Sequence, residues 1–303
     1  MAAGGTPFLG GAAVIARTGG GGRLLRGGLI GLLLALVLAV GAGGQGWGRR
    51  WAERPPRDIF SAGTFTFCRV EYSSRDRGGW GGRRGGWATD YPESDLNFSL
   101  RLSQLTALEV GRKDNGDFAH AVVRLDEPEL FNFPFIYMIE VGGLVFSEAE
   151  REGLRSYLLR GGFLLVDDFW GDEGWENWQY EFEQVLPPEQ FPMVDIPSDH
   201  DLFNIVFQLN GVPQVPAVNH YRQWEETGST VEYRSGSYQR YGSAARCKGV
   251  FDRDGRLMAV ILHNTDLGDG WEREGDNYGY FRDFSAKKAY PMGINIVVYA
   301  MTH

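Results

Sequence analysis

The chain has 303 residues, of which 43% are hydrophobic and 14% aromatic, so it can bury a large core and cannot be disordered throughout. Its net charge of −9 is uneven, since residues 1–57 hold seven Arg against one Glu while the rest holds 23 basic against 38 acidic residues. A strongly acidic body repels phosphate backbones, which argues against nucleic acid as a partner.

The N-terminal region has the pattern of an export signal. Three Arg residues precede the apolar run 29–40, in the order typical of a secretory signal. As a helix this run spans about 18 Å, short of the roughly 30 Å of a bilayer core, which favours a cleaved signal over an anchor. We expect a signal peptide or signal anchor at 1–42, a flexible tether at 43–60 and a single domain at 61–303.

These boundaries predict an exported protein of the periplasm or cell envelope, with membrane contact only through the N-terminal segment if it is not cleaved. Cys68 and Cys247 are the only cysteines. They could pair in an oxidising compartment, but we favour two separate apolar fillers.

In chain order, the first half of the domain alternates between strands and helices. Apolar, β-rich runs predict strands at 65–72, 121–125 and 135–141. Ser94 or Asp95 is expected to cap a helix that runs to about Leu108. The side chains expected on its buried face are Phe98, Leu102 and Leu105.

The clearest helix start is the capping box formed by Ser147 and Glu150. This helix should end at Gly161, and the apolar run 163–166 that follows is typical of a strand buried on both faces. Strand, capped helix and strand in succession predict a right-handed βαβ unit.

The second half is expected to contain fewer regular elements. We predict helices at 175–186 and 199–207, irregular chain at 208–245, a hairpin of strands 247–251 and 257–263, and a helix from Ala289. The fold class is therefore α/β, a mostly parallel sheet with helices on both faces and a C-terminal β-hairpin insertion.

Four segments, at residues 87–92, 97–106, 161–171 and 289–295, together resemble a bacterial family known as domain of unknown function 4159. The resemblance covers residues 63 to 303. It implies a flavodoxin-like sandwich similar to the class I glutamine amidotransferases, and an envelope setting. Those enzymes carry a cysteine nucleophile on a sharp strand-to-helix turn, where this chain has Asp167-Asp168-Phe169-Trp170. Amidotransferase activity is therefore not expected.

Parallel α/β sheets bind ligands beyond the carboxyl ends of their strands. We expect a crevice there, lined by Asp90, Tyr91, Asp167, Asp168 and Trp170. Adjacent strand residues point to opposite faces, so only one of Asp167 and Asp168 should enter it. Each aspartate could bind a metal, act as acid or base, or accept hydrogen bonds from a sugar. Bonding to loop amides is the interpretation that we favour.

A second group of polar residues ends the predicted hairpin. His263, Asp266 and Asp269 could bind a divalent cation, but their spacing is not that of a calcium loop, and we favour a turn whose carboxylates accept amide protons. No cofactor is predicted, and a divalent cation stays an open alternative.

The leading hypothesis is a non-catalytic domain that binds a glycan, a small ligand or an envelope protein. The alternative is a hydrolase, with carbohydrate as one substrate class, that uses Asp167 or Asp168 as acid or base and His263 or His220 as its assistant.

Overall fold

The computed structural model describes residues 63–74, 86–232 and 244–303. The signal peptide predicted at 1–42 and the tether predicted at 43–60 lie outside the described residues. In the described part of the chain, every helix is too short or too polar to cross a lipid bilayer.

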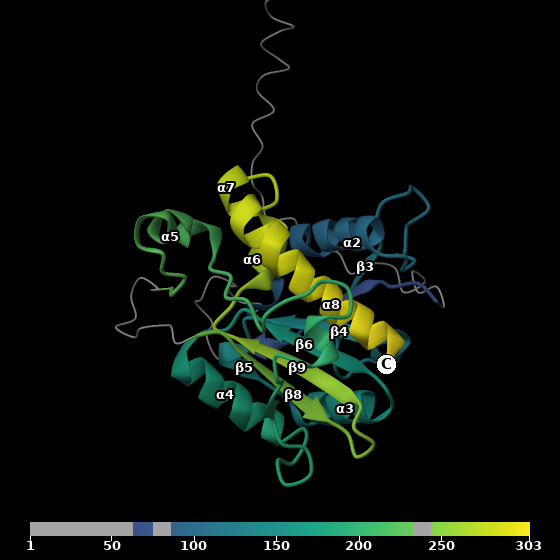
Figure 1. The fold of residues 1–303 in the computed structure, drawn as a ribbon. Coiled ribbons are helices and arrows are strands. Elements are labelled where there is room, and N and C mark those ends of the chain that lie inside the picture. The colour runs from purple at the N-terminus through teal and green to yellow at the C-terminus, as the bar shows by residue number, and fades with distance from the viewer. Residues whose placement is uncertain (1–62, 75–85, 233–243) are drawn as a thin grey trace, which may run out of the picture. The chain divides into compact units, whose positions relative to one another are not determined.

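A seven-stranded sheet with the order β3-β1-β4-β6-β9-β8-β7 organises the domain (Figure 1). Its strands are β1 (Phe67–Glu71), β3 (His120–Arg124), β4 (Phe135–Ile139), β6 (Phe163–Asp167), β7 (Val194–Asp195), β8 (Arg246–Phe251) and β9 (Leu257–His263). The strands from β3 to β9 are parallel, and β8 and β7 add antiparallel neighbours at one edge. A separate small sheet joins β2 (Ser73–Ser74) to β5 (Leu144–Val145).

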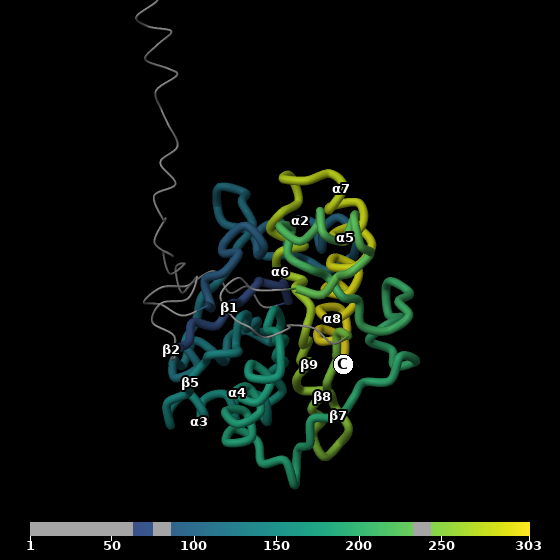
Figure 2. Tube along the Cα trace, turned by 90° about the vertical axis from the view of Figure 1, so that its left-hand side faces the viewer, coloured from purple at the N-terminus to yellow at the C-terminus, as the bar shows by residue number. Residues whose placement is uncertain are grey.

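Helices cover both faces of the sheet, as Figures 1 and 2 show. The α-helices are α2 (Glu93–Leu105), α3 (Glu148–Leu159), α4 (Gly171–Glu183), α5 (Tyr221–Thr227), α6 (Leu267–Glu272), α7 (Tyr278–Tyr280) and α8 (Tyr290–Thr302). A π-helix at Phe281–Ala289 joins α7 to α8. Short 3-10 helices occupy Gly86–Ala88, Pro128–Asn132, Val141–Gly143, Asp201–Phe203 and Val218–His220.

Alternation along the buried strands builds two apolar layers. In β6, Leu164 and Val166 pack on the side of α3 and α4, whereas Phe163 and Leu165 pack on the side of α2, α6 and α8. Every residue of β6 is buried, and the strand pairs in parallel with β4 and β9. The predicted strand buried on both faces is thus confirmed, as is the α/β fold class.

Two elements that sequence chemistry marks strongly are also confirmed. The capping box is present, with the Ser147 side chain accepting from the Glu150 amide and the Glu150 side chain accepting from the Ser147 amide. The hairpin exists as β8 and β9, and β9 also pairs with β6, so the hairpin extends the main sheet. Cys68 and Cys247 are free and buried, as the filler interpretation predicts.

Several boundaries and caps were predicted wrongly. Helix α2 begins at Glu93 and ends at Leu105, without a side-chain cap. Ser94 and Asp95 lie inside it because both bind the buried guanidinium of Arg69. Leu105, expected to be buried, is 49% exposed.

Further along the chain, three more predictions need correction. Helix α4 begins at Gly171 instead of 175, because Trp170 already has the extended backbone of an N-cap. The helix expected at 199–207 is one 3-10 turn, Asp201–Phe203. Helix α5 (Tyr221–Thr227) occupies part of the stretch expected to be irregular, and it is stabilised by stacking of Tyr221 on Trp224.

Candidate acidic site

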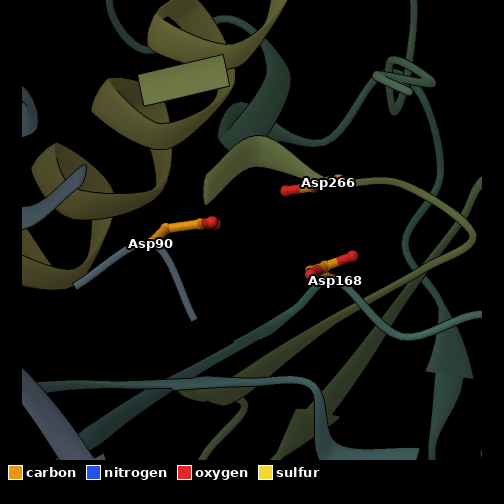
Figure 3. A group of neighbouring side chains, drawn as sticks. All are labelled: Asp90, Asp168 and Asp266. Atoms are coloured by element: carbon orange, nitrogen blue, oxygen red, sulfur yellow. The ribbon is translucent and has the colours of Figure 1, made fainter. Parts of the chain in front are cut away.

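Three carboxylates from separate segments meet at the carboxyl edge of the sheet. Asp90, Asp168 and Asp266 each offer one oxygen, and these oxygens all lie within 4.8 Å of one another. Figure 3 shows the three side chains directed toward a common space. Asp90 precedes α2, Asp168 follows β6 and Asp266 follows β9, so the parallel pairing of β6 with β9 brings the last two together. We call these residues the acidic triad.

The backbone turns sharply at two positions of the triad. Asp90 has a φ of 61° and Asp168 a φ of 49°, both in the left-handed region that non-glycine residues rarely adopt. Such conformations cost roughly 1–3 kcal/mol each and persist only where surrounding contacts impose them. Asp266 is held differently, because its Oδ1 accepts the amide of Asp269 at 2.7 Å and so caps α6.

Asp167 lies next to the triad in the chain but is not one of its members. Its Oδ2 accepts the amides of Leu267 and Gly268, at 2.9 and 3.1 Å, and the hydroxyl of Tyr137 at 3.1 Å. Burial raises the pKa of this carboxyl to about 7. Asp167 therefore fixes the start of α6 to the end of β6.

Burial is the largest electrostatic influence on the triad, and repulsion between carboxylates adds to it. The pKa of Asp266 is raised well above its ordinary value by burial and by the charges of Asp168, Asp269, Asp90 and Asp167. The pKa of Asp90 is also raised, first by burial and then by the charges of Asp269 and Glu272, although Arg69 and Arg273 act in the opposite direction. Among the described residues, no donor reaches the buried Oδ2 of Asp90.

A second carboxylate group shares Asp90 and includes Asp269 and Glu272. Here a cation is already present, because Nε of Arg273 lies 3.3 Å from Oδ1 of Asp269 and 2.7 Å from Oε2 of Glu272. The other oxygen of Asp269 accepts the amide of Val218. The protein itself thus compensates part of the charge of this second group.

Two aromatic residues expected to line the site have internal partners. The hydroxyl of Tyr91 lies 3.0 Å from Nε2 of His120. Trp170 is 5% exposed, and its indole Nε1 donates to Oδ1 of Asp168 at 3.0 Å. Trp170 therefore orients Asp168 and has little surface left to stack on a sugar.

His263 is buried in an aromatic environment at the end of β9. Its ring packs against Phe169 and Trp175, and its Nε2 lies 2.9 Å from the carbonyl oxygen of Gly171. Burial lowers its pKa to about 4, which keeps the imidazole neutral. In the part of the chain that the structure describes, no hydrogen bond joins His263 to a carboxylate.

The chemistry available at the triad is that of hard oxygen donors, which suit cations. Sequence reasoning placed Asp90 and Asp168 at one edge and treated Asp266 separately, as part of the hairpin end. Sequence reasoning did not use the fact that the residues following two adjacent parallel strands lie at the same edge of the sheet. Glu272, three residues after Asp269 in α6, was not considered, because nothing in its residue type or its spacing from the other acidic residues indicates a site.

An α/β domain with a mostly parallel sheet and acidic side chains beyond its strand ends belongs to the flavodoxin-like class of architectures. The family model described as "Domain of unknown function (DUF4159)" matches residues 66–301, nearly the whole domain, so the chain belongs to this family. A comparison with curated proteins gave no match.

Proposed function

We propose that this chain is an exported, non-catalytic binding domain whose acidic triad recognises a positively charged ligand. The observation that carries the proposal is the convergence of three carboxylates from separate segments, with Asp168 and Asp266 buried and Asp90 partly buried, into one mutually repelling group. Buried like charges are unfavourable unless a partner of opposite charge compensates them. The ligand would supply that charge as a metal ion or as a protonated amine, such as that of an amino sugar.

Binding is a better supported role than hydrolysis. An acid–base pair requires its members within hydrogen-bond reach or joined by one water. His263 instead packs between aromatic rings, and Nδ1 of His220 lies 3.8 Å from Glu232 rather than beside an aspartate of the triad.

An amidotransferase-like fold is part of the same proposal, without amidotransferase chemistry. It is supported by the parallel sheet and by the position of β6 at its centre. Cys68 and Cys247 lie within β1 and β8, and burial raises the pKa of both thiols, which makes them poor nucleophiles.

The binding proposal is tested by thermal unfolding of the full chain with glucosamine, spermidine or manganese chloride. At least one of these probes should raise the melting temperature, because a ligand that binds only the folded state stabilises it. Asp168→Asn should abolish the rise. The control is Asp254→Asn, since Asp254 is exposed in the β8–β9 turn at the opposite edge of the sheet. If no probe raises the melting temperature, or if both variants respond alike, the proposal fails.

Export is tested separately. A fusion of residues 1–60 to alkaline phosphatase, an enzyme that needs oxidised cysteines, should be active in bacterial cells. An inactive fusion would place the domain in the cytoplasm instead.

A further inference from the structure

We propose that Asp90, Asp168 and Asp266 bind a single divalent metal ion of the Mg²⁺ or Mn²⁺ type. The inference rests on the proposed function and names the ligand that provides the positive charge. The three carboxylates form one site, so one ion per chain is expected.

The spacing of the oxygens suits a single ion. Oxygens bound to Mg²⁺ at about 2.1 Å lie roughly 3 to 4 Å apart, depending on whether they are adjacent or opposite. The triad oxygens lie within 4.8 Å of one another, so small side-chain rotations bring all of them to bonding distance. The remaining coordination positions would be filled by water or by an oxygen-rich ligand.

Unused acceptor capacity at two carboxylates of the triad independently points to a cation site. Asp266 is 4% exposed, and the described residues give its carboxylate one hydrogen bond, from the amide of Asp269. Oδ2 of Asp90 is buried, has no donor among the described residues, and belongs to a side chain directed toward Asp266 (Figure 3). A buried anionic oxygen without a donor is costly, and a metal ion relieves that cost for both residues at once.

The donor set selects the metal. All three ligands are carboxylates, which favour hard ions over Zn²⁺ or Cu²⁺, whose sites use imidazole or thiolate. Three protein oxygens are few for Ca²⁺, which takes six to eight, but are normal for Mg²⁺, which retains several waters. The second group, at Asp269 and Glu272, is not expected to bind an ion because Arg273 pairs with both residues.

The test is a titration of the full chain, freed of metal with EDTA, with manganese chloride, and free Mn²⁺ is counted by electron paramagnetic resonance. One Mn²⁺ per chain should bind, and Mg²⁺ should displace it. Asp168→Asn and Asp266→Asn should each weaken Mn²⁺ binding at least ~10-fold, a loss that even outer-shell substitutions cause at metal sites. Asp254→Asn should bind Mn²⁺ like the wild type.

A folding defect is distinguished by the metal-free melting temperature. Asn also caps helices well, so Asp266→Asn keeps the start of α6 while removing one repelling charge. Its metal-free melting temperature should therefore equal or exceed that of the wild type, although its response to Mn²⁺ is lost.

Several results would overturn the inference. One is that Asp168→Asn and Asp266→Asn bind Mn²⁺ as tightly as the wild type. Another is that a second ion binds and that Glu272→Gln abolishes its binding. A third is that Ca²⁺ binds more tightly than Mg²⁺ and Mn²⁺. If Mn²⁺ does not bind but glucosamine or spermidine stabilises the chain in an Asp168-dependent manner, the metal inference fails while the proposed function stands. If no probe binds, both fail.

Discussion

Asp167 and Asp168 are neighbours in the chain, yet their carboxylates have entirely different partners. Asp167 accepts two amides at the start of α6 and the hydroxyl of Tyr137. Asp168, turned by its left-handed backbone, accepts a hydrogen bond from the indole of Trp170 and faces the other two members of the acidic triad. One carboxylate therefore holds α6 against the sheet and positions Asp266, while the other contributes its charge to the site.

The loop that carries Asp90 depends on a buried ion pair between Arg69 of β1 and Asp95 of α2. Both side chains are fully buried, and Nη2 of Arg69 lies 2.6 Å from Oδ1 of Asp95. The guanidinium also donates to the carbonyl oxygens of Trp87 and Thr89, just before Asp90. Arg69→Met should lower the free energy of unfolding by about 3–5 kcal/mol, since it leaves a buried carboxylate unpaired. Urea denaturation measures this loss.

The matched control for Arg69→Met is Arg222→Met. Arg222 pairs with Glu226 on the exposed face of α5, where ion pairs contribute about 0–1 kcal/mol. In addition, Asp95→Asn introduced into Arg69→Met should recover part of the lost stability, because it removes the unpaired charge. Equal, small effects of the two Arg substitutions would contradict the structural role of Arg69.

Burial of His263 predicts a specific pH dependence of stability. Its pKa is about 4 in the folded chain, against about 6.5 for an unperturbed His. The unfolded state therefore binds a proton first as the pH falls, so the stability held above pH 6.5 is lost progressively down to pH 4. At ~1.4 kcal/mol per unit, the loss from this residue amounts to about 3 kcal/mol.

His263→Phe isolates this contribution, because Phe keeps a ring between Phe169 and Trp175 but cannot be protonated. The unfolding free energy of wild type minus that of the variant should decrease by about 3 kcal/mol between pH 7 and pH 4. Urea titrations at several pH values measure it, and contributions of other groups cancel in the difference. A difference that stays constant with pH would show that His263 is accessible to protons in the folded state.

The parts of the fold that sequence predicts well are those encoded locally. The run 163–166 is apolar without interruption, and Ser147 and Glu150 are three residues apart, so burial and capping follow from neighbouring residues alone. The cap expected at Ser94 or Asp95 failed because a side chain 25 or more positions away, Arg69, binds both residues. No local pattern contains that partner.

The same difference between local patterns and distant partners explains which part of the site could be predicted from the sequence. Asp90 and Asp168 were placed at one edge because each follows an element that points there, and the fold class sufficed for that inference. Asp266 joins them only because β9 pairs with β6 across about a hundred residues of sequence. A hairpin predicted as an insertion carries no information about which strand it extends, so the triad was not predictable as a unit.

The close approach of α6 to Asp90 gives a last prediction, at Gly268. A Cβ at this position would lie 2.7 Å from Oδ2 of Asp90 and 2.9 Å from both the Tyr137 hydroxyl and Ile139. Gly268→Ala should therefore cost about 1–3 kcal/mol of stability through overpacking, despite the better helix propensity of Ala.

Gly275→Ala is the matched control, since a Cβ there meets nothing within 4 Å, and its effect should stay within about 0.5 kcal/mol. Asp90→Ala removes one of the obstructing atoms, so Gly268→Ala should cost less in that background, with a coupling energy of about 0.5 kcal/mol or more. Urea denaturation of the two single variants and the double variant measures this coupling. Strict additivity of the two substitutions would mean that Asp90 does not lie against α6, and the acidic triad would lose the residue that joins it to the start of α2.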